Sequence, residues 1–314
     1  MGSSSSKITH DFFPFVRVYE DGRVKRMLNY KPVPPTDNPT TGVRSKDVVI
    51  VPETNVWVRL YLPRTTGDDD CRKFPLLIFI HGGAFCLGSA SDDNYDNFLH
   101  SLTAEANTVT LSVEYRLAPE HKLPACYDDS WSAIEWAWTQ MHAKDDGGQS
   151  GAEPWLKNHA DFSRVFFAGD SAGATIAHNM MVRASDEFNL KISPKPVGMI
   201  LLHPFFGNHE KNKFWEFLCP DTTGPEDPLF NPAAHPGLLS KLVCSKVLVC
   251  IAEWDLIRES GNTYYEALKN SEWRGELELE YSKKRTHVFF LGKRNCDQAR
   301  SLMKKIVSFI NNQP

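Results

Sequence analysis

A serine flanked by glycines is the feature of this chain best suited to chemistry. Gly169-Asp170-Ser171-Ala172-Gly173 follows an apolar run at 165–168 and precedes a helix-like segment at 174–181. A G-x-S-x-G pattern between a strand and a helix is typical of a sharp turn that exposes a nucleophilic serine at a helix N-terminus. Taken alone, the pattern also fits a glycine-flanked turn with a helix-capping serine.

A second glycine-containing loop offers groups that such a serine needs. The continuous apolar run 74–80 predicts a strand buried on both faces, and it ends in His81-Gly82-Gly83-Ala84-Phe85. Glycines here let backbone N–H groups approach a substrate carbonyl, so we expect an oxyanion hole made by Gly82, Gly83 and Ala172. An ordinary strand-to-helix turn is the alternative for this loop alone.

An acid and a base follow the serine in chain order. Asp255 lies just beyond the apolar run 246–252, and His287 is the only one of the eleven histidines that follows it. A serine hydroxyl becomes nucleophilic when an imidazole takes its proton, and a carboxylate orients that imidazole. We therefore expect Ser171, Asp255 and His287 to transfer an acyl group to water through an acyl-serine, with Glu253 as the alternative acid.

With these motifs, the chain resembles plant carboxylesterases of the HGGG, or hormone-sensitive-lipase-like, branch of the α/β-hydrolases. The resemblance runs from residues 15–24 to the last helical segment and is most specific at 113–121, 123–129 and 159–164. It implies a catalytic triad of Ser171, Asp255 and His287 and an oxyanion motif that begins at His81. We expect a small to medium uncharged ester as substrate, because aromatic walls suit flat apolar groups and no long amphipathic lid helix is evident in the sequence. No metal or cofactor is expected.

Two positions depart from the pattern of that family. Ala84 stands in place of a third glycine, and the basic run Lys283-Lys284-Arg285 precedes Thr286-His287 where relatives carry acidic residues. A basic run close to the imidazole would disfavour its protonated form, whereas a solvated run would have little effect.

The family also implies two alternatives to a serine esterase. One is a lyase or cyclase of plant specialised metabolism, near the 2-hydroxyisoflavanone dehydratases, and the other is a hormone-binding receptor of the gibberellin-receptor kind. Such receptors lack the triad histidine, and dehydratases often have threonine at the nucleophile position, whereas this chain has His287 and Ser171. Ester hydrolysis is therefore the favoured hypothesis.

Composition agrees with a cytoplasmic enzyme that acts on a small molecule. The net charge of −4 gives no electrostatic footprint for nucleic acid, and no apolar stretch is long enough to span a membrane. The first six residues lack the apolar core of a secretory signal, although Gly2 and Ser6 fit a loose myristoylation pattern. The seven cysteines fit buried thiols in a reducing compartment. We expect a monomer or a weak homodimer.

Alternating strand-like and helix-like runs predict one α/β-hydrolase domain over 1–314, with a mostly parallel sheet covered by helices on both faces. The expected strands are 47–51, 56–62, 74–80, 109–115, 165–168, 196–202, 247–252 and 276–281. The expected helices are 94–105, 127–142, 172–184, 261–270 and 296–311. Residues 65–70 predict a turn, and 143–153 predict an exposed loop.

Two segments interrupt this alternation. Residues 1–45 contain prolines that favour irregular structure, and residues 205–242 contain both an aromatic cluster and further prolines. The family resemblance implies that the two segments form a small cap over the active site. We predict that Phe85, Phe214, Trp215 and Phe217 wall the substrate site, with packing onto the domain as the alternative.

Overall fold

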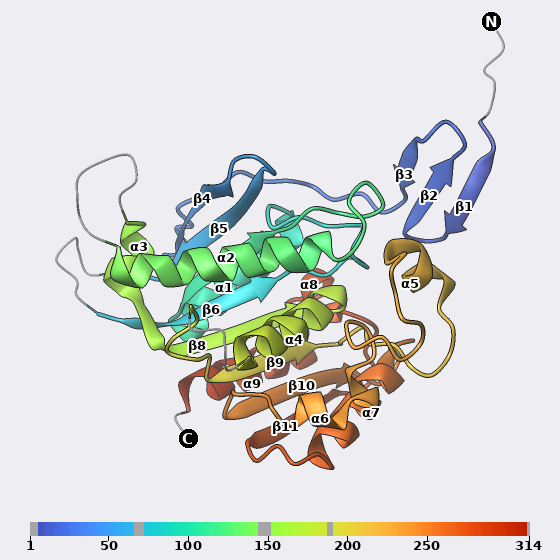
Figure 1. Cartoon of the computed structure of the whole chain (residues 1–314). Coiled ribbons are helices and arrows are strands. Elements are labelled where there is room, and N and C mark those ends of the chain that lie inside the picture. The colour runs from blue at the N-terminus through green and yellow to red at the C-terminus, as the bar shows by residue number, and fades with distance from the viewer. Residues whose placement is uncertain (1–5, 66–71, 144–151, 187–190, 313–314) are drawn as a thin grey trace, which may run out of the picture.

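An eight-stranded sheet forms the centre of the computed structural model, which describes residues 6–65, 72–143, 152–186 and 191–312 (Figure 1). In spatial order the strands are β11 (Glu276–Ser282), β10 (Lys246–Ala252), β9 (Gly198–Leu202), β8 (Ala160–Asp170), β6 (Phe74–Ile80), β7 (Val109–Glu114), β5 (Val56–Leu62) and β4 (Arg44–Val51). Strands β11 to β7 pair in parallel, and β5 and β4 add an antiparallel edge. The predicted fold class is confirmed.

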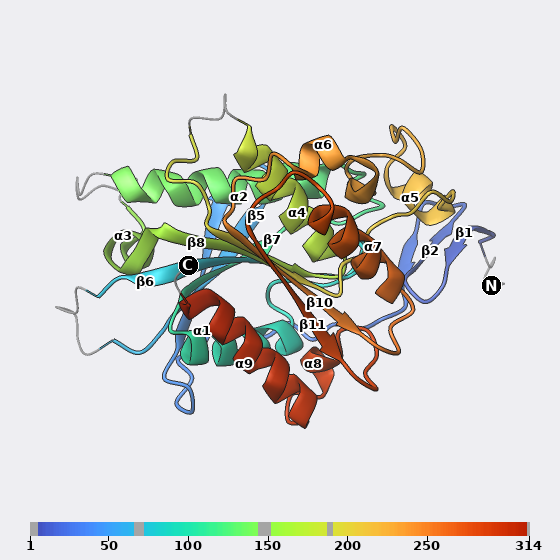
Figure 2. The same cartoon turned by 90° about the horizontal axis from the view of Figure 1, so that it is seen from below.

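Helices cover both faces of this sheet (Figure 2). One face carries α2 (Ala125–His142), α4 (Ala172–Ser185) and α7 (Arg258–Lys269), and the other carries α1 (Asp93–Ala106), α8 (Phe289–Gly292) and α9 (Asp297–Asn311). The shorter helices are α3 (Pro154–His159), α5 (Lys213–Leu218), the 3-10 turn η1 (Pro232–Ala234) and α6 (Pro236–Leu239).

The central strand β6 shows why its sequence is apolar throughout. Leu76, Ile78 and Ile80 enter the hydrophobic core under α2 and α4, whereas Leu77 and Phe79 enter the core under α1 and α9. Successive side chains of a strand point to opposite faces, so a strand that is covered on both faces needs apolar residues at every position.

The N-terminal segment differs from the irregular structure predicted for it. Strands β1 (Ile8–Phe12), β2 (Val16–Tyr19) and β3 (Val24–Arg26) form a separate antiparallel sheet at one end of the molecule, beside α5 (Figure 1). Most of their side chains are exposed or half-buried, so no apolar alternation marks these strands in the sequence. The predicted turn at 65–70 and loop at 143–153 lie almost wholly outside the described residues.

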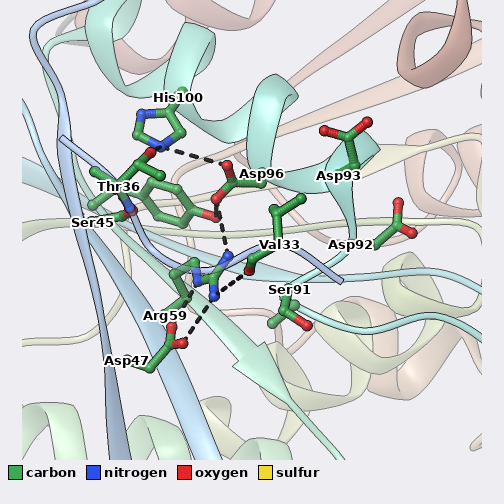
Figure 3. A network of polar contacts seen from close by, with 12 residues as sticks. Val33, Thr36, Ser45, Asp47, Arg59, Ser91, Asp92, Asp93, Asp96 and His100 are labelled. Carbon is green, nitrogen blue, oxygen red and sulfur yellow. Dashed lines mark hydrogen bonds and ion pairs between the residues drawn. The ribbon is translucent and has the colours of Figure 1, made fainter. Parts of the chain in front are cut away.

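The segment after β3 is tied to the main sheet by a buried arginine (Figure 3). Arg59 is 1% exposed and donates to the Asp47 carboxylate at 2.7 and 2.9 Å, to Asp96 Oδ1 at 3.1 Å and to the Val33 carbonyl at 3.0 Å. Tyr61 adds a 3.0 Å hydrogen bond to the same Asp96 oxygen. A buried guanidinium shared between two carboxylates thus connects the sheet, α1 and the N-terminal segment.

The two predicted cap segments contact each other through aromatic rings. Phe12 lies 5.1 Å from Phe214 and 4.9 Å from Phe217, and Phe15 stacks on Phe214 at 5.5 Å between ring centroids. These contacts seat the small N-terminal sheet on α5. Within the described ranges, no helix combines the length and the apolar character needed to cross a membrane.

Candidate active site

Ser171 sits on a strained turn between β8 and α4. Its backbone has φ 52° and ψ −120°, which L-residues rarely adopt. The flanking glycines allow the turn: a Cβ on Gly169 would lie 2.4 Å from the Gly173 carbonyl oxygen, and one on Gly173 would lie 2.1 Å from the Ile80 carbonyl oxygen. The G-x-S-x-G spacing therefore reflects close packing of the turn against β6.

The structure brings Ser171, His287 and Asp255 together in one chain of hydrogen bonds. Ser171 Oγ lies 2.9 Å from His287 Nε2, and His287 Nδ1 lies 2.7 Å from Asp255 Oδ2. An ionised carboxylate only accepts hydrogen bonds, so Nδ1 carries the imidazole proton and Nε2 accepts the serine proton. This is the arrangement that activates a serine nucleophile.

Asp255 is held in the ionised form that this arrangement needs. Burial raises the pKa of its carboxyl, but the hydrogen bond from His287, the charge of His287 and the Ile257 N–H at 3.0 Å together bring the pKa below its ordinary value. Glu253 turns elsewhere and accepts the Lys284 N–H at 2.7 Å. The structure therefore places the favoured acid, and not the alternative, beside the imidazole.

The basic run before His287 does not converge on the imidazole. The Arg285 guanidinium donates to Gln298 Oε1 at 3.1 Å and lies over the Phe289 ring at 5.9 Å. Lys283 and Lys284 are exposed, so water screens their charges.

The predicted oxyanion donors divide into two groups. The Gly82 N–H is buried and already faces two protein acceptors, Asp170 Oδ1 at 3.0 Å and the Tyr95 hydroxyl at 2.9 Å. The Tyr95 hydroxyl in turn donates to Asp170 Oδ2 at 3.0 Å. The prediction for Gly82 is therefore corrected, because its N–H is used to fix the loop and not offered to a substrate.

Gly83 and Ala172 keep their backbone donors available. Among the described residues, neither N–H has a protein acceptor, and Gly83 lines the cavity that contains Ser171. Gly83 has φ 110°, and a Cβ there would lie 2.1 Å from the Leu87 carbonyl oxygen, so only glycine fits. Ala84, in place of the third glycine, adopts the left-handed region at φ 53°.

His81 helps hold this loop in place through contacts with Tyr115. Its ring stacks on Tyr115 with centroids 4.2 Å apart, and the Tyr115 hydroxyl donates to the His81 carbonyl at 2.8 Å. Burial lowers the pKa of His81 to about 4, so its ring is neutral at physiological pH.

His203 is a member of the site that the sequence predictions missed. It follows β9 with φ 49°, and its Nδ1 accepts the Val288 N–H at 2.9 Å and lies 3.4 Å from Asp255 Oδ2. Burial lowers the pKa of His203 to about 3, so the neutral ring packs behind the acid without a charge. The available signal was a polar residue at the carboxyl end of a buried parallel strand, where sites of this fold class gather.

A cavity of about 650 Å³ opens above Ser171. The N-terminal segment contributes Phe15, Leu28 and Tyr30. Phe205, at the start of the 205–242 segment, and Trp254 and Leu256, after β10, complete the apolar part of the wall. Of these, Leu256 and Trp254 are largely exposed at the surface. The volume suits a drug-sized ligand, and most of the lining is apolar.

The aromatic residues predicted to wall this site pack elsewhere in the structure. Phe85, Phe214, Trp215 and Phe217 do not line the cavity. Trp215 stacks on Phe230 at 4.3 Å, and the buried Phe85 ring lies 5.8 Å from Trp215. Phe85 and Trp215 pack between the domain and α5, which was the alternative for this cluster, whereas Phe214 and Phe217 pack against Phe12 and Phe15 of the N-terminal segment.

Comparison with known proteins agrees with this geometry. The α/β-hydrolase fold family matches residues 77–291. A probable carboxylesterase of Arabidopsis thaliana, carboxylesterase 2, is 38% identical over 99% of this chain and 99% of its own. A 2-hydroxyisoflavanone dehydratase of Glycyrrhiza echinata is 39% identical over 98% of each chain.

One solved structure, a thermophilic carboxylesterase cloned from a metagenomic library, has a TM-score of 0.69 at 20% identity and covers 91% of this chain and 92% of its own. At that identity the likeness bears on the fold alone. The family match and the two relatives at 38% and 39% identity confirm the resemblance predicted from the sequence.

Proposed function

Because the chain belongs to the α/β-hydrolase family, we propose that it is a serine carboxylesterase that hydrolyses small to medium uncharged esters. The observation that carries the proposal is the hydrogen-bonded series from Ser171 Oγ through His287 to Asp255 at the floor of a largely apolar cavity. Curated relatives named carboxylesterases, similar over nearly their whole length, support the same activity.

In the proposed mechanism, His287 Nε2 takes the Ser171 proton as Oγ attacks the ester carbonyl. Asp255 stabilises the imidazolium that forms, and the N–H groups of Gly83 and Ala172 hold the negative oxygen. Removing one such donor typically costs about 2.7–4 kcal/mol of transition-state stabilisation. His287 then protonates the departing alcohol, and water releases the acid from Ser171 by the same route in reverse.

The proposed enzyme works in the cytoplasm, as a monomer or weak homodimer, on a small molecule. Among the described residues, six cysteines are free thiols, and five of them are buried. Burial raises the pKa of the Cys219 thiol to about 11, which keeps it protonated and unreactive. Such thiols fit a reducing compartment.

A dehydratase-type lyase is the second candidate, because a relative of that name is 39% identical. Elimination of water uses a base and an oxyanion site but forms no acyl-serine. The receptor alternative is weaker, because hormone binding needs no hydrogen-bonded serine, imidazole and carboxylate.

The test is hydrolysis of nitrophenyl butyrate by the wild type, Ser171→Ala and His287→Ala. We expect each substitution to lower kcat by about 10⁴-fold or more, with a smaller change in substrate binding. His235→Ala is the matched control, since His235 binds the Glu226 carbonyl outside the cavity. Wild-type turnover by Ser171→Ala would refute the covalent mechanism. Elimination of water from a hydroxylated phenolic substrate by Ser171→Ala would favour the lyase.

A further inference from the structure

Tyr30 presents a polar group to the cavity that the proposed hydrolysis does not use. Among the described residues its hydroxyl has no hydrogen-bond partner, yet it is not one of the unpartnered polar atoms that are sealed inside the protein. Tyr30 lines the cavity, and the charges of Asp170 and Asp92, which also line it, act on the Tyr30 phenol, which indicates that its hydroxyl faces the cavity.

The backbone around Tyr30 is fixed without help from that hydroxyl. The Lys31 N–H donates to Asp92 Oδ2 at 3.0 Å, and the Lys31 carbonyl accepts the Asp93 N–H at 2.9 Å. Two residues on, the Val33 N–H donates to the Ser91 carbonyl at 2.9 Å. Main-chain hydrogen bonds to the start of α1 therefore hold the segment, and the Tyr30 hydroxyl takes no part in them.

The charges that line the cavity favour a hydrogen-bond donor in the ligand. Asp92, Asp170 and Asp255 line it, and among the described lining residues there is no lysine or arginine. Burial, with the Asp170 and Asp92 carboxylates adding to it, raises the pKa of Tyr30. The Tyr30 phenol is neutral, and its oxygen can accept a hydrogen bond from a ligand. An anionic ligand would meet repulsion from the carboxylates.

We propose that Tyr30 is a specificity-determining residue that accepts a hydrogen bond from a hydroxyl group of the substrate. The preferred substrates are then aromatic esters that carry a free hydroxyl, with the ring against Phe15, Phe205 and Trp254. Aromatic walls supply most of the binding energy in such sites, and a few polar groups fix the orientation. This inference rests on the proposed esterase function.

The test compares three matched esters: 2-naphthyl butyrate, its 6-hydroxy derivative and its 6-methoxy derivative. The methoxy group keeps the oxygen and the bulk but cannot donate. We expect the wild type to prefer the hydroxy over the methoxy ester in kcat/KM by about three- to tenfold, the worth of one hydrogen bond. In Tyr30→Phe the ratio should fall to about one, mainly through KM.

Two controls separate binding from structure. Tyr19→Phe removes a hydroxyl from β2, outside the cavity, and should keep the wild-type ratio. Tyr30→Phe should keep the wild-type melting temperature, because the hydroxyl that it loses has no protein partner.

The inference is overturned if the wild type shows no preference, if Tyr30→Phe keeps the wild-type ratio, or if Tyr30→Phe melts lower and so reveals a structural hydroxyl. Failure of the proposed function is a different result. In that case Ser171→Ala would hydrolyse all three esters as fast as the wild type.

Discussion

Replacing Asp170 by asparagine is expected to stabilise the protein at neutral and alkaline pH. Asp170 is 1% exposed, and burial raises its pKa from 3.8 to about 6 against the opposing effect of hydrogen bonds from Tyr95 and Gly82. Between these two pH values the folded state binds more protons at this carboxyl than the unfolded state does. Wild-type stability therefore falls as the pH rises through this window.

The size of the effect follows from the same pKa values. The rise from 3.8 to about 6 corresponds to about 3 kcal/mol of stability lost above pH 6. The asparagine oxygen still accepts the Gly82 N–H, but the Tyr95 hydroxyl loses its carboxylate acceptor, at a cost of about 1 kcal/mol. Asp170→Asn should thus exceed the wild type by about 2 kcal/mol at pH 8 and fall about 1 kcal/mol below it under pH 4.

The measurement is urea unfolding followed by tryptophan fluorescence from pH 4 to pH 8, with refolding checked at each pH. The difference between variant and wild type cancels other buried groups, such as Glu114, whose pKa burial raises to about 7. Asp170→Ala is the control: it leaves both the Gly82 N–H and the Tyr95 hydroxyl without an acceptor, so it should be less stable than Asp170→Asn at every pH. A difference between Asp170→Asn and wild type that stays flat with pH would refute the reasoning.

Two further predictions concern the elbow and the buried arginine. Gly173→Ala should lower kcat/KM for nitrophenyl butyrate by about 100-fold, because its Cβ would meet the Ile80 carbonyl oxygen at 2.1 Å and shift the nucleophile. Gly237→Ala, whose Cβ meets nothing within 4 Å, should match the wild type, and equal activity of the two variants would contradict the prediction. Arg59→Met should lower the free energy of unfolding in urea by about 3–5 kcal/mol, since it leaves the Asp96 carboxylate buried without its cation. A loss under about 1 kcal/mol would show that this ion pair adds little.

Much of the fold was predictable because its signals are local. The strands 56–62 and 74–80 have the predicted bounds, since 74–80 is apolar throughout and 56–62 is apolar except for Arg59. The strand at the elbow was underestimated: β8 begins at Ala160, where Asp161, Ser163 and Arg164 interrupt the apolar pattern but pair with one another at the surface. Strands β1 to β3 were missed because backbone pairing and contacts with α5 hold them, and neither leaves a period in the sequence.

The sequence by itself determined those parts of the site that depend on chain order and on short motifs. Glycines two residues on either side of Ser171 are required by the turn itself, and His287 was the only histidine after Asp255. Geometry then places those three side chains in one hydrogen-bonded chain.

Only the tertiary structure decided which groups face the substrate cavity. Gly82 and Gly83 are adjacent glycines of one motif. Asp170 and Tyr95 accept the Gly82 N–H, whereas among the described residues the Gly83 N–H has no acceptor. Phe15, Phe205 and Tyr30 line the cavity in place of the predicted aromatic cluster. Such choices depend on packing between segments far apart in the chain, and a short motif holds no information about which distant side chain will fill the space beside it.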